Sequence, residues 1–168
     1  MVLTKEELIA SLQNEVRILG HLMSKVDPAH LDYRPTAKQR STLELLQYLV
    51  IMGPNLVKGI KAGAFDGAAW GVAQTEAAAM SFDQVKEAIA KQASWYAEHL
   101  GALSDADLRA QIEMFGRKAS RGVILVELVL CGYSAYRTQL FCYLKACGRE
   151  ALSTWDLWAG MDAPPPTK

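Results

Sequence analysis

The segment spanning residues 120–148 predicts one long, largely buried helix, and it constrains the fold more than any other part of the chain. Ser120 is a favourable N-cap, because its hydroxyl can accept a hydrogen bond from a free backbone N–H group of the first turn. Lys145 and Gly148 are typical of a helix C-terminus. Between these ends, apolar residues recur at helical spacing, at Val123, Val126, Leu130, Phe141 and Leu144. The rest of the chain should therefore be organised around this helix.

Three further helices are predicted from capping residues followed by apolar periodicity. Thr4 and Glu7 fit the S/T-x-x-E capping box, and so do Ser41 and Glu44. In this motif the hydroxyl and the glutamate each satisfy a backbone N–H group that has no partner within the helix. Ser81 is the predicted N-cap of the third helix. Together with the long C-terminal helix, these segments predict an all-α chain.

The segments between the helices are predicted to be connections. Residues 29–40 are bounded by prolines and lack periodicity, which favours an ordered loop. Residues 63–80 are rich in Gly and Ala and predict a long connection with room for a short helical piece. Residues 105–120 have a short and mixed pattern, so we also expect a loop there. Pro54 should kink the second helix or end its regular part near Met52.

The length and charge of the chain limit the possible classes of protein. A chain of 168 residues fits one domain, residues 1–168, with a frayed Pro-rich tail from about residue 161. Lys plus Arg equals Asp plus Glu at 18, so no net charge would draw the chain to nucleic acid or an anionic membrane. The apolar runs are too short to span a bilayer, and the N-terminal segment lacks the apolar core of a signal peptide. We therefore expect a cytoplasmic protein that binds neither nucleic acid nor membrane.

Four side chains of the long helix carry separate expectations. Cys131, Cys142 and Cys147 are spaced so that a straight helix cannot bring them into disulfide geometry, and we expect reduced, buried thiols. Arg137 would be costly to bury alone. We therefore expect it to have a carboxylate partner and a structural role.

Two segments resemble a known family. The sequence AYRTQLFCYLKACG is similar to the last bundle helix of the DinB/YfiT-like family, where two histidines four residues apart precede an Arg and a Gln. The sequence RPTAKQRSTLELLQYL is similar to the beginning of that family's second helix, which ends in a ligand histidine followed by Leu. The resemblance covers most of the chain. It implies a four-helix bundle with long connections and a short C-terminal helix, and it also implies a homodimer.

The resemblance further implies where a metal would bind. In the family one histidine of the second helix and two of the last helix hold the ion, and some members are metal-dependent thiol transferases. The matching positions here are Tyr48, Gly132 and Tyr136. Glycine has no side-chain ligand, and a phenol with a pKa near 10 is a poor ligand for zinc or nickel at neutral pH. We therefore expect no metal at these positions and no cofactor.

The region that the metal would have occupied is the candidate ligand-binding site, made of Tyr48, Gly132 and Tyr136 with Glu44 and Glu127. Glu44 shares a helix face with Tyr48, and Glu127 lies on a turn flanking Gly132. Two interpretations remain open. The rings either fill the core, with each hydroxyl bonded to a carboxylate, or they frame a small-molecule pocket beside the glycine.

The remaining histidines give little support to another metal site. None of them forms an H-x-x-x-H or H-E-x-x-H spacing. We expect them to be hydrogen-bonding residues at or near the surface. These histidines are His21, His30 and His99.

Three hypotheses for the function follow. The leading one is a metal-independent small-molecule-binding or structural homodimer, for which we assign no catalytic residue. The alternative is an enzyme, such as a thiol S-transferase, acting through Tyr48, Tyr136 or Cys131, although Cys131 has no sequence-adjacent base to lower its pKa. The third is a regulatory dimer with a tryptophan at its interface. The tryptophans considered for that interface are Trp70, Trp155 and Trp158.

Overall fold

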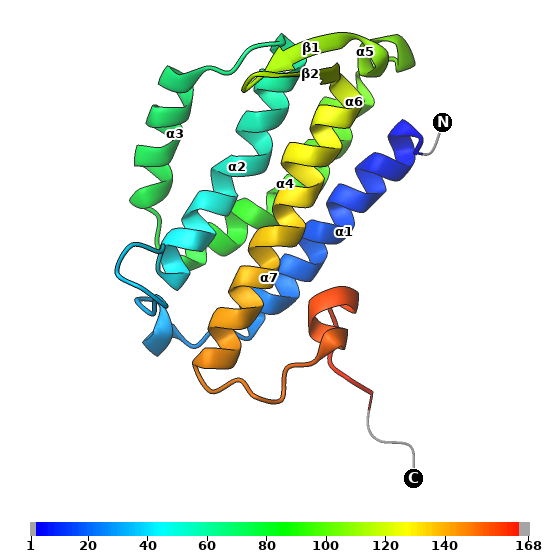
Figure 1. Ribbon diagram of the computed structural model, residues 1–168. Coiled ribbons are helices and arrows are strands. Elements are labelled where there is room, and N and C mark those ends of the chain that lie inside the picture. Colours follow the sequence, from blue (N-terminus) through cyan, green and yellow to red (C-terminus); the bar gives the residue numbers. More distant parts are fainter. Residues whose placement is uncertain (1–2, 165–168) are drawn as a thin grey trace.

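The computed structural model describes residues 3–164 and shows four long helices packed as a bundle (Figure 1). The first three are α1 (Lys5–Ser24), α2 (Thr42–Ala62) and α4 (Phe82–Gly101). The fourth consists of three consecutive segments, α6 (Arg121–Ile124), the π-helical turn η2 (Leu125–Leu130) and α7 (Cys131–Ala146). Both α1 and α2 pack against α4 and α7, and the apolar core lies between them. The predicted all-α bundle is confirmed.

The capping residues define the helix starts as predicted. Thr4 and Ser41 each form a capping box with the glutamate three residues later, and Ser81 forms one with Gln84. In the Ser41 box, the Glu44 carboxylate accepts a hydrogen bond of 2.8 Å from the Ser41 N–H group. These motifs are local in sequence, which is why they could be found without the tertiary structure.

Two of the predicted connections contain regular structure. Helix α3 (Gly67–Ala78) occupies most of residues 63–80 and lies outside the bundle, against α2 (Figure 1). It begins at Asp66, whose carboxylate accepts a hydrogen bond of 2.9 Å from the Ala69 N–H group. Its alanines favour the helix intrinsically, but it has no apolar stripe, so periodicity did not reveal it. The expected connection with a short helical piece is therefore a helix of 12 residues.

The predicted loop at residues 105–120 is wrong. It contains α5 (Asp105–Arg109) and an antiparallel hairpin of β1 (Gln111–Met114) and β2 (Arg117–Ser120). The two turn residues, Phe115 and Gly116, both have positive φ, at 53° and 76°. This is the geometry of a two-residue type I′ turn, which usually has Asn or Asp rather than Phe at its first position. The hairpin therefore lacks the usual sequence signal.

Helix α2 continues through Pro54 to Ala62, so of the two expected effects of this proline, an end of the helix near Met52 does not occur. Proline has no N–H group to bond the carbonyl of Val50 four residues earlier. The Gln92 side chain of α4 supplies the missing donor, because its Nε2 lies 2.9 Å from the Val50 oxygen and 3.0 Å from the Leu49 oxygen. A buried amide from a neighbouring helix thus satisfies the carbonyl that the proline leaves free.

The C-terminal arm, residues 149–164, contains a short π-helical turn, η3 (Trp155–Ala159), that packs against α1 and α7 (Figure 1). Arg17 of α1 donates hydrogen bonds of 2.7 and 3.1 Å to the carbonyls of Ala159 and Gly160. A short final helix was predicted, but Trp155 and Trp158 remain 46% and 67% exposed. Of the predicted frayed tail, residues 161–164 continue from this turn, and residues 165–168 lie outside the described part of the chain.

The long helix places its thiols differently from expectation. Cys131 and Cys142 are exposed and Cys147 is partly buried, so the prediction of buried thiols is wrong. Cys131 and Cys142 lie 11 residues apart, about three helical turns, and share the solvent face of α7. All three thiols are free. Within residues 3–164, no helix is long and apolar enough to cross a membrane.

Candidate functional site

Two tyrosines meet where α2 and α7 face each other. The rings of Tyr48 and Tyr136 have centroids 5.0 Å apart and are inclined at 65°, an edge-to-face contact. Trp70 of α3 contacts Tyr48 from another side, with ring centroids 6.0 Å apart. The guanidinium of Arg40 lies 4.1 Å from the centre of the Tyr48 ring. Tyr48 is therefore surrounded by aromatic rings and a cation.

Gly132 faces α2, but its neighbour there is Met52. A Cβ atom placed on Gly132 would lie 3.2 Å from the Met52 sulfur. Met52 lies one turn after Tyr48 on α2 and is 1% exposed. The thioether therefore occupies the space in front of the glycine, as expected of a flexible side chain that fills gaps in a core.

The environment of Tyr48 keeps its hydroxyl protonated. Burial raises the pKa of Tyr48 well above its ordinary value, and the hydroxyl of Tyr136 raises it further, while Arg40 lowers it less. A neutral phenol is a weak ligand for zinc or nickel, and Gly132 offers no ligand atom. The residues at these three positions therefore do not fit a transition-metal ion.

A cavity of about 280 Å³ adjoins Tyr48 between α2 and α3. Its lining includes the predicted site residues Tyr48 and Glu44, together with Arg40, Gln47 and Gln74. Gln47 ties the end of α3 to α2, because its amide donates hydrogen bonds of 3.2 and 2.9 Å to the carbonyls of Ala78 and Met80. The cavity thus depends on α3 being held in place.

Glu44 is already engaged within the protein. The hydrogen bond from the Ser41 backbone, the largest effect, and the guanidinium of Arg34 hold the pKa of Glu44 below its ordinary value, although partial burial opposes them. One carboxylate oxygen lies 3.1 Å from an Arg34 nitrogen. Glu44 is therefore an ionised side chain at the wall of the cavity, with its charge compensated by Arg34.

Comparisons with known proteins place this geometry in a fold. No family model matches the sequence, and no curated protein matches it significantly. A DinB-like protein from Bacillus cereus superimposes with a TM-score of 0.69 and 18% identity, over 88% of this chain and 95% of its own. The DinB-like protein YjoA from Bacillus subtilis gives a TM-score of 0.64 and 18% identity, over 84% and 91%. The chain has a DinB-like fold.

The DinB-like bundle does not bring all the predicted site residues together. Tyr48 and Glu44 line one cavity. Tyr136 contacts the Tyr48 ring, and Gly132 lies against Met52. Glu127 lies apart, where it pairs with Arg117 of β2 and lines a different cavity of about 510 Å³. Glu127 belongs to the π-helical turn, which contains more residues per turn than an α-helix and changes which residues face the bundle.

Three residues at the Tyr48 cavity or beside Gly132 were not assigned to the candidate site from the sequence. They are Arg40, Met52 and Gln74. Arg40 is the last residue of the loop at residues 29–40 and immediately precedes the Ser41 cap. Its position next to this cap could have indicated that it lies beside the second helix. Gln74 reaches the site only because residues 67–78 form α3.

The expected carboxylate partner of Arg137 is confirmed, and two of the three histidines make the expected hydrogen bonds. Arg137 pairs with Glu15 of α1, with Nε and Oε2 2.6 Å apart, and both side chains are at least nine-tenths buried. His21 and His99 form hydrogen bonds, His21 with Asp156 and His99 with the carbonyl of Trp95. The Arg137–Glu15 pair joins α7 to α1, which is consistent with the expected structural role of Arg137.

Proposed function

We propose that this chain is a cytoplasmic protein that binds a small molecule in the cavity beside Tyr48, without a metal ion at that site. The observation that carries this proposal is the position of Arg40, whose guanidinium stacks on the Tyr48 ring at the edge of the cavity. At about 280 Å³ the cavity is slightly smaller than the pockets of about 300–1,000 Å³ that hold drug-sized ligands. The ligand is therefore a small compound.

The charges around the cavity favour a carboxylate on this ligand. Within residues 3–164, the Arg40 guanidinium makes no ion pair within 4.0 Å of an acidic side chain. Its charge contributes to the lowered pKa of Glu44, but the ion-pair partner of Glu44 is Arg34. A guanidinium offers a fork of N–H donors that matches the two oxygens of a carboxylate. The amides of Gln47 and Gln74 add polar groups to the lining. A small carboxylic acid with an apolar or aromatic body fits these features.

The environment of Tyr48 weighs against a catalytic role for its hydroxyl. A raised pKa keeps Tyr48 in its neutral form, which is a poor nucleophile and a poor general base at neutral pH. Cys131 lies on the solvent face of α7. No contact of the described residues favours the alternative of thiol S-transfer, so we propose a binding protein without a catalytic residue.

The binding proposal is tested with a panel of small carboxylic acids and matched neutral amides, by ligand-observed NMR and thermal shift. We expect at least one acid to bind and its amide to bind more weakly. Arg40→Ala should lower the affinity at least about tenfold, because it removes one charge-assisted hydrogen bond to the ligand. Arg109→Ala on α5 is the control, because Arg109 is an exposed arginine in another part of the fold. Equal binding by wild type and Arg40→Ala would refute the assignment.

We also propose that the chain is a homodimer, as the resemblance to the DinB/YfiT-like family implies. Exposed apolar side chains on several elements offer surface for such an interface. They include Val72, Phe115, Trp155, Trp158 and Met161. Sedimentation at micromolar concentration should give the mass of two chains, and a single-chain mass would count against this proposal.

A further inference from the structure

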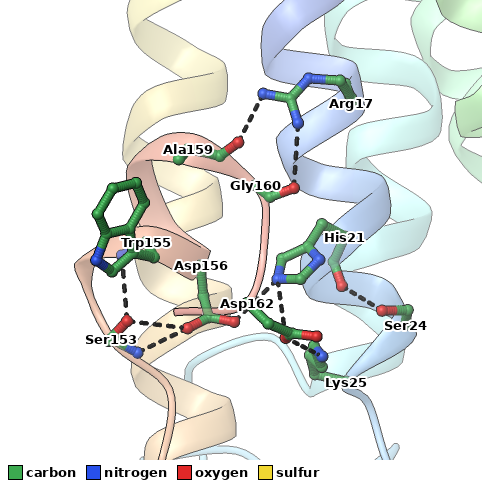
Figure 2. Close-up of polar contacts among 10 residues, drawn as sticks. All are labelled: Arg17, His21, Ser24, Lys25, Ser153, Trp155, Asp156, Ala159, Gly160 and Asp162. Carbon is green, nitrogen blue, oxygen red and sulfur yellow. Dashed lines mark hydrogen bonds and ion pairs between the residues drawn. The ribbon is translucent and has the colours of Figure 1, made fainter. Parts of the chain in front are cut away.

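Three side chains with metal-binding atoms converge where the C-terminal arm meets α1, away from the Tyr48 cavity. Figure 2 shows His21 from the last turns of α1 facing Asp156 and Asp162 of the arm. The His21 Nε2 atom lies 2.9 Å from an Asp156 oxygen and 3.9 Å from an Asp162 oxygen. One ligand atom from each of the three lies within 4.8 Å of the other two. No other such group of three occurs within residues 3–164.

We propose that His21, Asp156 and Asp162 form a binding site for a divalent transition-metal ion of the zinc type. Ligands about 2.0–2.2 Å from a tetrahedral zinc ion lie about 3.3–3.6 Å from one another. The separations of 2.9 and 3.9 Å fall on either side of that range, so only small side-chain movements are needed. One imidazole and two carboxylates are a ligand set that zinc accepts, with water in the fourth position.

Asp156 is the most deeply buried of the three ligands, and its carboxylate is already oriented toward His21. Asp156 is 2% exposed, and one of its oxygens accepts hydrogen bonds from the N–H group and the hydroxyl of Ser153, at 2.8 and 3.3 Å. Its other oxygen is thereby directed at His21 (Figure 2). Hydrogen bonds of this kind commonly hold metal-ligating carboxylates in place.

The site has room for a fourth ligand. A cavity of about 490 Å³ adjoins Asp156 and Asp162 and is also lined by Lys25 and Arg149. Asp162 is 75% exposed at its side chain, whereas His21 is 14% exposed. A metal ion would therefore enter from the side of Asp162, and a water molecule could complete its coordination from the cavity.

Lys25 competes with the metal ion. Its ammonium pairs with the same Asp162 oxygen that faces His21 (Figure 2). An exposed pair of this kind contributes little stability, and a lysine has a flexible stem, so an ion can displace it. The two carboxylates outnumber this one ammonium, so the group has negative charge for the ion to compensate. Removing the Lys25 charge should therefore strengthen metal binding.

The test is calorimetric titration of the untagged full chain with zinc at pH 7.5, followed in parallel by tryptophan fluorescence, because Trp155 lies beside Asp156 on the arm. We expect one equivalent of zinc to bind and the fluorescence to change with it. Asp162→Asn and His21→Ala should each weaken binding at least about tenfold. Lys25→Met should strengthen it severalfold. His30→Ala, which removes an exposed histidine at the end of the short 3₁₀ helix η1 (Pro28–His30), should leave binding unchanged.

Asp162→Asn is the decisive variant, because Asp162 is exposed and the arm keeps its Asp156 and Arg17 contacts without it. Its fold is checked by circular dichroism. Absence of binding at about 100 μM zinc would overturn the proposal, because this concentration is far above the dissociation constants of typical zinc sites. Zinc binding that is equal in wild type, Asp162→Asn and His21→Ala would also overturn it, since the ion would then bind elsewhere.

Discussion

Gly53 of α2 lies where the side chains of Tyr96 and Tyr133 cross the centre of the bundle. The two hydroxyls are 2.7 Å apart, and Tyr133 also donates to the Gln92 carbonyl oxygen. A Cβ atom on Gly53 would overlap the Tyr96 hydroxyl and lie 2.6 Å from that of Tyr133. Both tyrosines are fully buried, and burial raises the pKa of each. This buried network therefore depends on a glycine at position 53.

Gly53→Ala should destabilise the protein by about 2–3 kcal/mol, because the added methyl group forces the tyrosines from their positions. Urea denaturation measures this change. Gly20→Ala on α1 is the matched control, since a Cβ atom there meets nothing within 4 Å. It should stabilise the protein by about 0.5–1 kcal/mol through helix propensity. A Gly53→Ala protein as stable as wild type would show that the close approach is not real.

Helices α2 and α4 are joined at the point where Pro54 removes one backbone hydrogen bond from α2. Pro54 leaves the Val50 carbonyl without its helical partner, and Gln92 of α4 replaces that partner with a side-chain amide. The amide oxygen of Gln92 in turn accepts from Tyr133 of α7. One buried side chain therefore joins three helices, and it does so only because α2 contains a proline.

Gln92→Leu should cost about 2–3 kcal/mol, because it leaves the Val50 carbonyl without a partner and removes one of the two hydrogen-bond partners of the Tyr133 hydroxyl. In a Pro54→Ala background the same substitution should cost about 1 kcal/mol less, since residue 54 then supplies an N–H group to Val50. The free energies of unfolding of wild type, both single variants and the double variant give this coupling. Additive losses would mean that Gln92 does not substitute for the missing helical donor.

The starts of three bundle helices could be predicted from the sequence, whereas α3 and the hairpin could not be predicted fully. The starts of α1, α2 and α4 follow from caps that involve residues three positions apart. Only a short helical piece was predicted in place of α3, because its alanines form no apolar stripe. The hairpin was not predicted, because Phe115 occupies a turn position that normally has Asn or Asp. The displacement of Glu127 follows from a π-helical turn, which a regular helical repeat does not reveal.

At the scale of the whole molecule, the sites depend on segments that lie outside the bundle. The cavity beside Tyr48 exists because α3 closes against α2, and the His21 group exists because the arm returns to α1 (Figures 1 and 2). His21 and Asp156 are 135 residues apart. Neither association follows from local sequence patterns, whereas the bundle itself follows from periodicity and from resemblance to a family.

We propose that Tyr48, Gly132 and Tyr136 hold no metal ion. The zinc and nickel content of untagged His21→Ala protein, measured after incubation with each metal and desalting, tests this proposal. This variant removes the proposed site on the arm, so any remaining ion must bind elsewhere. We expect less than about a tenth of an equivalent per chain. Close to one equivalent, lost on further substitution of Tyr48→Phe, would refute the proposal.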